Sequence, residues 1–200
     1  MSTEQQLSFI AAIRCDDTTM KFFEQMQAVP EGQGNLLTTN HQYSTTTRKM
    51  VRVHKARNVH ERTRSDEMVV YFNRHDDHYA LQVRSDKFLG KYLIKTSNGL
   101  LGATTGAGSD TTLFNLLNNE QQVITLDDLQ NTHASVYLQV RNSGVIKRQH
   151  MQEPRLYCYG DGSGESVKFN LRILERNVLQ PTGNEPYPLF IEPITESDED

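Results

Sequence analysis

The feature that most constrains the fold is a four-strand pattern in residues 79–117, YALQVRSDKFLGKYLIKTSNGLLGATTGAGSDTTLFNLL. Residues 81–84 alternate apolar and polar side chains, as a strand with one buried face does. Residues 91–95 form a second run typical of a strand, and residues 97–99 (SNG) favour a tight hairpin turn. After a third apolar run and a glycine-rich loop, residues 112–116 complete the unit.

Imperfect copies of this unit lie on both sides of it. Downstream, at an offset of 45, residues 136–146 repeat the second and third strands and align Tyr137 with Tyr92. After an insertion of ten residues, residues 167–171 repeat the fourth strand. Upstream, at an offset of 70, Phe22 aligns with Tyr92, and residues 50–53 take the place of the fourth strand. Internal repeats are stronger evidence on fold than any single segment.

One such unit has no means of burying its own apolar face, whereas three units around a pseudo-threefold axis close a barrel. We therefore predict an all-β chain, a β-trefoil over residues 8–178, with Phe22, Tyr92 and Tyr137 in equivalent places. Residues 1–7 are expected to be a flexible N-terminus and residues 179–200 a proline-containing acidic tail. Residues 17–29 also satisfy helix signals, but the repeat favours a strand at residues 21–23.

The recurring pattern RS…GKYL…NGLL…LFNL, between Arg84 and Leu116, resembles the repeat of fascin-like trefoils. The fold that it implies is similar to that of fibroblast growth factors and interleukin-type cytokines. The resemblance implies non-enzymatic protein recognition, either cytokine-like signalling or fascin-like filament binding. It rests on core and turn residues, and a fold alone does not determine function.

A basic run at residues 48–64, RKMVRVHKARNVHERTR, holds seven Lys or Arg and two His against one acid, in a chain of net charge −4. Such a local charge density predicts a polyanion site for a sulfated glycan, a nucleic acid or an acidic protein face; the alternative is a solvated face. The run contains no aromatic residue for base stacking, so we do not expect sequence-specific nucleic-acid binding. The predicted polyanion-binding residues, including a second and smaller cluster, are Arg48, Lys49, Arg52, Lys55, Arg57, Arg62, Arg64, Arg141, Lys147 and Arg148.

A glycine-rich loop at residues 153–165 carries the predicted contact residues for protein or sugar. These are Tyr157, Tyr159 and Asp161, since tyrosines on such loops are common contact residues; the alternative is that the tyrosines pack over the barrel. The chain has no Trp, so the Gln-x-Trp repeats of ricin-type lectins are missing.

The sequence gives no support for a metal, a cofactor or an active site. The turn at residues 73–78 contains His75, Asp76, Asp77 and His78, which are ligand types, but a hairpin turn favours such residues anyway. The glycine-rich loop at residues 102–110 lacks the Lys-Ser/Thr ending of a phosphate-binding loop, and no catalytic fingerprint occurs. We expect no metal, no cofactor and no enzymatic activity.

Cys15 and Cys158 are the two cysteines, expected to be structural thiols in a reducing compartment; a single disulfide is the alternative. No signal-peptide pattern and no run long enough to cross a membrane occur, so no membrane insertion is expected. The predicted location is cytoplasmic, with leaderless secretion as the alternative.

The leading functional interpretation is a recognition protein that binds another protein through its loops, helped by a polyanion on residues 48–64. Three alternatives stay open: a glycan-binding lectin, a loop-based protease inhibitor, and a structural or virion assembly subunit.

Overall fold

The computed structural model describes residues 7–16, 18–23, 36–44, 49–52, 67–85, 88–151, 156–179 and 181, with residues 39–44, 49–52 and 156 described by their backbone alone. Predictions for residues 1–6, 53–66 and 182–200 lie outside these ranges, as do those for the helical alternative beyond residue 23. Arg48, Lys55, Arg57, Arg62 and Arg64 are among the residues that are not described.

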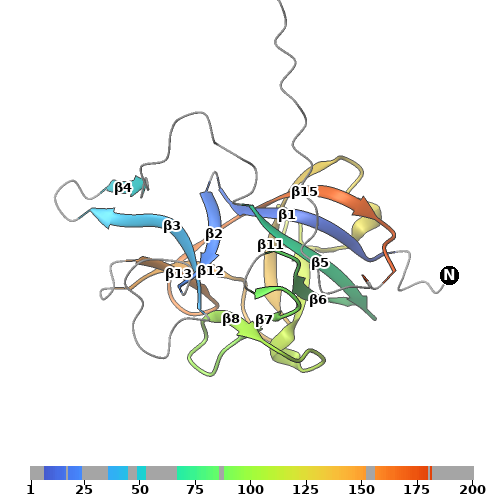
Figure 1. Ribbon diagram of the computed structural model, residues 1–200, viewed down its shortest axis with the longest axis horizontal. Helices are drawn as coiled ribbons and strands as arrows, with labels where there is room; N and C mark the ends of the chain where they lie inside the picture. Colours follow the sequence, from blue (N-terminus) through green and yellow to red (C-terminus); the bar gives the residue numbers. More distant parts are fainter. Residues whose placement is uncertain are drawn as a thin grey trace, which may run out of the picture.

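Six antiparallel strands close into a barrel, and the prediction of an all-β chain is confirmed (Figure 1). The ring runs β1–β5–β6–β9–β11–β15 and returns to β1. Closure leaves these strands without free edges, so every wall strand has two neighbours. The barrel strands are β1 (Phe9–Cys15), β5 (Met68–His75), β6 (His78–Val83), β9 (Leu113–Leu117), β11 (His133–Val140) and β15 (Phe169–Arg176).

Aromatic rings fill the barrel interior. Phe9 stacks on Phe72 with ring centroids 4.4 Å apart, and Tyr79 meets Phe9 edge-on at 5.7 Å. The buried hydroxyl of Tyr79 accepts a hydrogen bond from the backbone N–H of Leu126, at 3.1 Å. Apolar burial with paired polar tips is the main source of stability in such a core.

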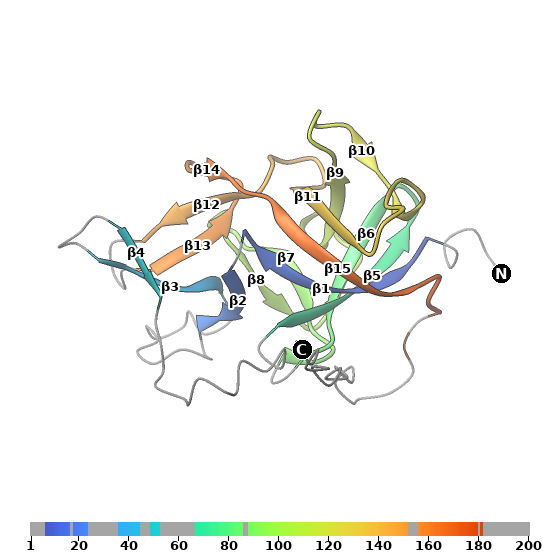
Figure 2. The same cartoon turned by 90° about the horizontal axis from the view of Figure 1, so that it is seen from above.

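Paired strands outside the ring form three hairpins and their extensions. β2 pairs with β3, β7 with β8, and β12 with β13; β4 extends β3, β14 extends β12, and β10 pairs with β9. Because β13 also pairs with β3, the first and third hairpins join into one sheet, to the left of the barrel in Figures 1 and 2. These strands are β2 (Thr18–Phe22), β3 (Leu37–Ser44), β4 (Lys49–Arg52), β7 (Tyr92–Lys95), β8 (Leu101–Thr104), β10 (Val123–Ile124), β12 (Lys147–His150), β13 (Leu156–Gly160) and β14 (Glu165–Ser166). Two 3-10 turns, η4 (Asp110–Thr112) and η5 (Leu126–Asp128), complete the described elements.

Several local predictions are confirmed. The strand favoured at residues 21–23 is found as β2, which ends at Phe22. The turn at residues 97–99 exists, and Gly99 supplies its positive φ of 77°. The predicted fourth strand of the central unit is β9, and β5 and β6 pair as the hairpin around the turn at residues 76–77.

Two strand assignments are wrong. Residues 136–140 belong to the barrel strand β11, paired with β9 and β15, so Tyr137 is not equivalent to Phe22 or Tyr92 on the hairpins. Similarly, β4 extends the β2–β3 hairpin, and β5 takes the barrel position assigned to residues 50–53. Both errors arose because short apolar strands look alike whether they form barrel walls or hairpins.

Candidate anion-binding site

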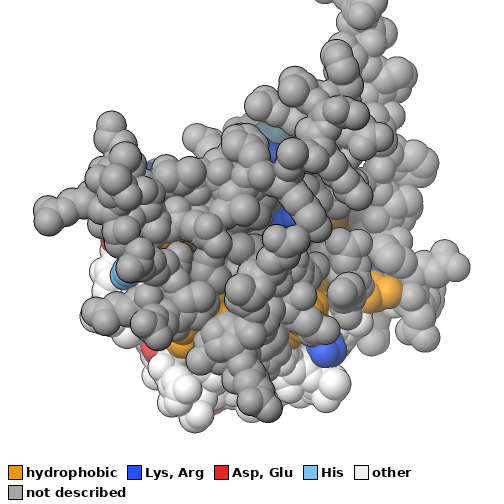
Figure 3. Space-filling model, turned by 60° about the vertical axis from the view of Figure 1, so that its left-hand side comes forward, with side chains coloured by type: hydrophobic (Ala, Val, Ile, Leu, Met, Phe, Trp, Pro, Cys, Tyr) orange, Lys and Arg blue, Asp and Glu red, His pale blue; other side chains and the backbone are white. Residues whose placement is uncertain are grey.

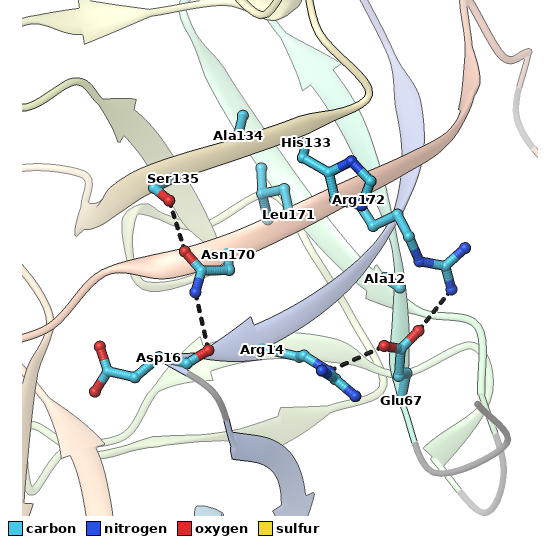
Figure 4. A pocket seen from close by; sticks show the side chains of 10 residues that line it. All are labelled: Ala12, Arg14, Asp16, Glu67, His133, Ala134, Ser135, Asn170, Leu171 and Arg172. Carbon is cyan, nitrogen blue, oxygen red and sulfur yellow. Dashed lines mark hydrogen bonds and ion pairs between the residues drawn. The ribbon is translucent and has the colours of Figure 1, made fainter. Parts of the chain in front are cut away.

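A groove of about 610 Å³ lies on the outer wall of the barrel, where β1, β15 and β11 run side by side (Figure 4). Side chains alternate between the two faces of a strand. Ile13 and Leu171 point into the core, so their neighbours along β1 and β15 line the outer wall. Two cross-strand rows result, each with one arginine: one row runs from Ala12 through Arg172 to His133, and the other from Arg14 through Asn170 to Ser135. The lining residues are Ala12, Arg14, Asp16, Glu67, His133, Ala134, Ser135, Asn170, Leu171 and Arg172.

One carboxylate holds two arginines at one end of the groove. Glu67 precedes β5, and its Oε1 lies 2.9 Å from Nε of Arg14 while its Oε2 accepts a hydrogen bond from Nη2 of Arg172 at 2.6 Å. The Glu67 side chain is only 8% exposed, whereas those of Arg14 and Arg172 are 43% and 25% exposed. Both oxygens of the carboxylate are thus occupied, and the guanidinium groups are fixed from below with one side toward water.

The two arginines have donors to spare. Within the described chain, Nε of Arg14 is in ion-pair contact with Glu67 without a hydrogen bond of good geometry, and Arg172 donates through Nη2 alone, so each guanidinium keeps unused N–H groups. An arginine side chain carries five N–H donors and stays charged at any physiological pH. Among the described residues, one carboxylate faces two guanidinium groups at this end of the groove, which leaves a surplus of one positive charge.

The other end of the groove is internally bonded. Ser135 donates to Oδ1 of Asn170 at 2.6 Å, and Nδ2 of Asn170 donates to the backbone oxygen of Asp16 at 2.9 Å. The Asp16 carboxylate points away from the arginine end in Figure 4 and pairs with Arg148 at 3.1 Å. It therefore does not neutralise the positive charge of Arg14 and Arg172.

A second polar cluster lies among the turns of the hairpins. Nζ of Lys95 donates to Oδ2 of Asp161 at 2.9 Å and to Oγ of Ser143 at 2.7 Å, and Ser143 donates to the same carboxylate oxygen. Burial raises the pKa of Asp161, but the hydrogen bonds from Ser143 and Lys95 and the charge of Lys95 outweigh it and lower the pKa. Cation and anion balance in this cluster, and their side chains are 24% and 13% exposed.

Glycine allows this second cluster to close. An ideal Cβ on Gly160 would lie 2.3 Å from the backbone oxygen of Gly99, and the N–H of Asp161 donates to that oxygen at 3.1 Å. The cluster is therefore a brace between turns and offers no room for a ligand. Asp161 was predicted to contact a partner, but its carboxylate is already bonded to Lys95 and Ser143 and is only 13% exposed.

The other predicted contact residues, Tyr157 and Tyr159, have different environments. Tyr159 is completely buried, and its hydroxyl lies beside the Cys15 thiol, which is a weak hydrogen-bond partner. A surface contact by Tyr159 is therefore wrong, and the alternative that the ring packs inside is correct. Tyr157 is half-buried on β13 and carries the Arg148 guanidinium over its ring at 5.3 Å.

The predicted polyanion residues are not gathered into one described site. Arg141 pairs with Asp110 at 3.5 Å, and Arg148 pairs with Asp16 and Glu165, so acids already neutralise both arginines. Lys147 lies half-buried on β12, and Lys49 and Arg52 lie on β4. On the face shown in Figure 3, the visible Lys and Arg side chains of the described residues lie singly, not in a patch.

Both cysteines are free and buried. Burial raises the pKa of each thiol to about 11. In the described ranges, no three His, Cys, Asp or Glu side chains come close enough to hold a metal ion. The same ranges contain no helix with the length and apolar character to span a membrane.

The groove does not follow from any residue pattern along the sequence. A partial signal is present in the two strands, because Arg14 lies between Ile13 and Cys15 in β1, and Arg172 lies between Leu171 and Ile173 in β15. The sequence does not reveal that β1 pairs with β15, a pairing that places Ala12 beside Arg172, 160 positions later in the chain. No protein-family model matches the sequence, and no curated protein matches it significantly.

Proposed function

We propose that the protein is a non-enzymatic recognition protein of β-trefoil architecture, which binds a partner through an anionic group that enters the groove. The observation that carries the proposal is the pair of arginines on one carboxylate, because fixed guanidinium groups with unused donors are a common means of binding oxyanions. The groove volume of about 610 Å³ lies in the range of ligand sites.

The strand pairing supports the trefoil part of the proposal. Each of the hairpins β2–β3, β7–β8 and β12–β13 lies, in chain order, between two barrel strands: β1 and β5, β6 and β9, β11 and β15. Three such units, each with two barrel strands and one hairpin, together supply the six strands of the closed barrel. In this scheme the groove joins the first unit to the third, because β1 pairs with β15.

Affinity capture from the source organism, followed by mass spectrometry, tests the proposal. We expect at least one partner to be retained by the intact protein and lost by the double variant Arg14→Gln, Arg172→Gln. The matched control is Arg141→Gln, an arginine of similar exposure outside the groove, which should retain the partner. Identical partners for all three proteins would refute a binding role for the groove.

A polyanion site on residues 48–64 is a second candidate function. The observation that favours it is that β4, with Lys49 and Arg52, and β12, with Lys147 and Arg148, belong to one sheet in the order β12–β13–β3–β4. Retention on a heparin column with elution by salt tests this candidate, since polyanion binding is strongly salt-dependent. Passage of the intact protein without retention at low salt would eliminate it.

A further inference from the structure

We infer that the anionic group bound in the groove is a carboxylate of a protein partner, carried on an acidic side chain or at a chain terminus. This inference rests on the proposed function and adds the ligand class. Three observations support it: the charge of the arginine end, the orientation of the unused donors, and the chemistry of the remaining lining residues.

The charge of the arginine end suits a single negative charge. Arg14 and Arg172 bring two positive charges and Glu67 removes one, so one carboxylate restores neutrality. A dianion such as hydrogen phosphate would place an excess negative charge beside the Glu67 carboxylate, which is only 8% exposed. Like charges near a poorly solvated carboxylate repel each other strongly, so the site disfavours dianions.

The unused donors suit a planar group. Because Nε of Arg14 faces Glu67, the two terminal nitrogens of that guanidinium remain as a parallel pair of donors. Arg172, held through Nη2, keeps Nε and Nη1. A guanidinium edge matches the two oxygens of a carboxylate in a bidentate arrangement, while a tetrahedral oxyanion directs some of its oxygens out of that plane.

The rest of the lining favours a protein group over a sugar. Ala12, Ala134 and Leu171 offer small apolar contacts that suit the aliphatic part of an amino acid. Among the described lining residues there is no Phe, Tyr or Trp, and the imidazole of His133 is a smaller and more polar ring than those on which sugar faces usually pack. Ser135 and Asn170, which could bind sugar hydroxyls, already hydrogen-bond to each other.

Small probes on the intact protein test the ligand class without a variant. In NMR titrations that follow the backbone amides of Ala12, Asn170 and Arg172, we expect N-acetylglycine or N-acetylglutamic acid α-amide to bind at least tenfold more tightly than N-acetylglycinamide. The first acid represents a chain terminus and the second an acidic side chain, so their ranking identifies the source. We expect methyl sulfate, a tetrahedral monoanion, to bind at least threefold more weakly than the better carboxylate. Equal or tighter binding of methyl sulfate, or no binding of either acid, would overturn the inference.

Variants assign the binding to the arginine pair. Arg14→Gln and Arg172→Gln should each weaken binding of the carboxylate probe about tenfold, and Arg141→Gln should leave it unchanged. Glu67→Gln removes the resident negative charge, so the ratio of hydrogen phosphate affinity to carboxylate affinity should rise about tenfold. An unchanged ratio in a folded Glu67→Gln protein contradicts the charge argument, and the wild-type comparison decides the ligand class if that variant does not fold.

The two proposals fail in different ways. If partner capture depends on Arg14 and Arg172 but the carboxylate probes do not bind, the ligand class is wrong and the binding role stands. If the probes bind but the captured partners are the same with and without the arginines, the groove binds a carboxylate that is not the means of recognition.

Discussion

Two polar clusters in this protein each hold one carboxylate between two other polar side chains, but they differ in charge balance and in what surrounds them. In the groove, Glu67 is held by Arg14 and Arg172; among the turns, Asp161 is held by Lys95 and Ser143. The first set has more donors than its carboxylate accepts, and one of its guanidinium groups, that of Arg14, is 43% exposed. The second set is balanced in charge and is closed by backbone contacts. A carboxylate with two donors can therefore prepare a surface for a ligand or brace the fold, and the spare donors decide which.

The largest effect tests whether the turn cluster is a brace. Replacing Gly160 with Val places a Cβ 2.3 Å from the Gly99 carbonyl oxygen, so backbone must shift. We expect the free energy of unfolding, measured with urea, to fall by about 3 kcal/mol. Gly106→Ala is the control, because a Cβ there meets nothing within 4 Å, and its effect should stay within about 0.5 kcal/mol. A Gly160→Val protein as stable as wild type would show that the turns can separate freely.

Loss of the Glu67 carboxylate should destabilise the protein more than loss of an exposed surface carboxylate. Glu67→Gln leaves two guanidinium groups facing a neutral amide, and we expect a loss of about 2 kcal/mol in the free energy of unfolding. The loss is smaller than for a fully buried pair because water reaches both arginines. The control is Glu165→Gln, whose side chain is 75% exposed although it also pairs with an arginine. Equal losses in the two variants would contradict the special role of Glu67.

The Asp161 carboxylate predicts a pH dependence for the brace. Because its pKa is lower in the folded protein than in the unfolded chain, its charge stabilises the fold above the unfolded-state pKa. That contribution is lost as the pH falls through the folded-state pKa. We expect Asp161→Asn to cost about 1.5 kcal/mol at pH 7, and the difference from wild type to shrink as both proteins are unfolded at successively lower pH. A difference that stays constant across this acid range would mean that the charge of Asp161 does not stabilise the fold.

The smallest effect is expected at Arg141, outside both clusters. Its ion pair with Asp110 spans 3.5 Å between side chains that are 40% and 60% exposed, so Arg141→Ala should change the free energy of unfolding by less than about 0.5 kcal/mol. Thermal and urea unfolding together provide the measurement. A loss above about 1 kcal/mol would remove Arg141 as a neutral control for the groove.

Individual strands and turns could be predicted from the sequence better than the pairing of strands that lie far apart in the chain. The hairpin turn at Gly99 and the strand pair around residues 76–77 follow from turn chemistry and alternation, which act over a few residues. The assignment of Tyr137 failed because wall and hairpin strands share one apolar pattern, and only the pairing of β11 with β9 and β15 tells them apart.

The candidate site was harder to predict because its residues meet only through closure of the barrel. Arg14, Glu67 and Arg172 lie far apart in the chain and carry no motif. The basic run at residues 48–64 gathers its charges along the sequence. The groove instead gathers its charges across neighbouring strands, which the sequence does not show. Tyr159 shows the reverse error, since its place in a glycine-rich stretch suggested exposure, but it is 0% exposed and its ring lies against that of Phe169.

The buried thiols of Cys15 and Cys158 have a practical consequence. With a pKa of about 11, a thiol is almost wholly protonated at neutral pH, and the thiolate is the species that attacks alkylating reagents. Modification therefore requires that the chain first open around them. The rate at which a reagent labels each cysteine in native buffer would therefore report how often the structure opens locally. Cys15 would report on β1 in the barrel, and Cys158 on β13 in the adjoining sheet.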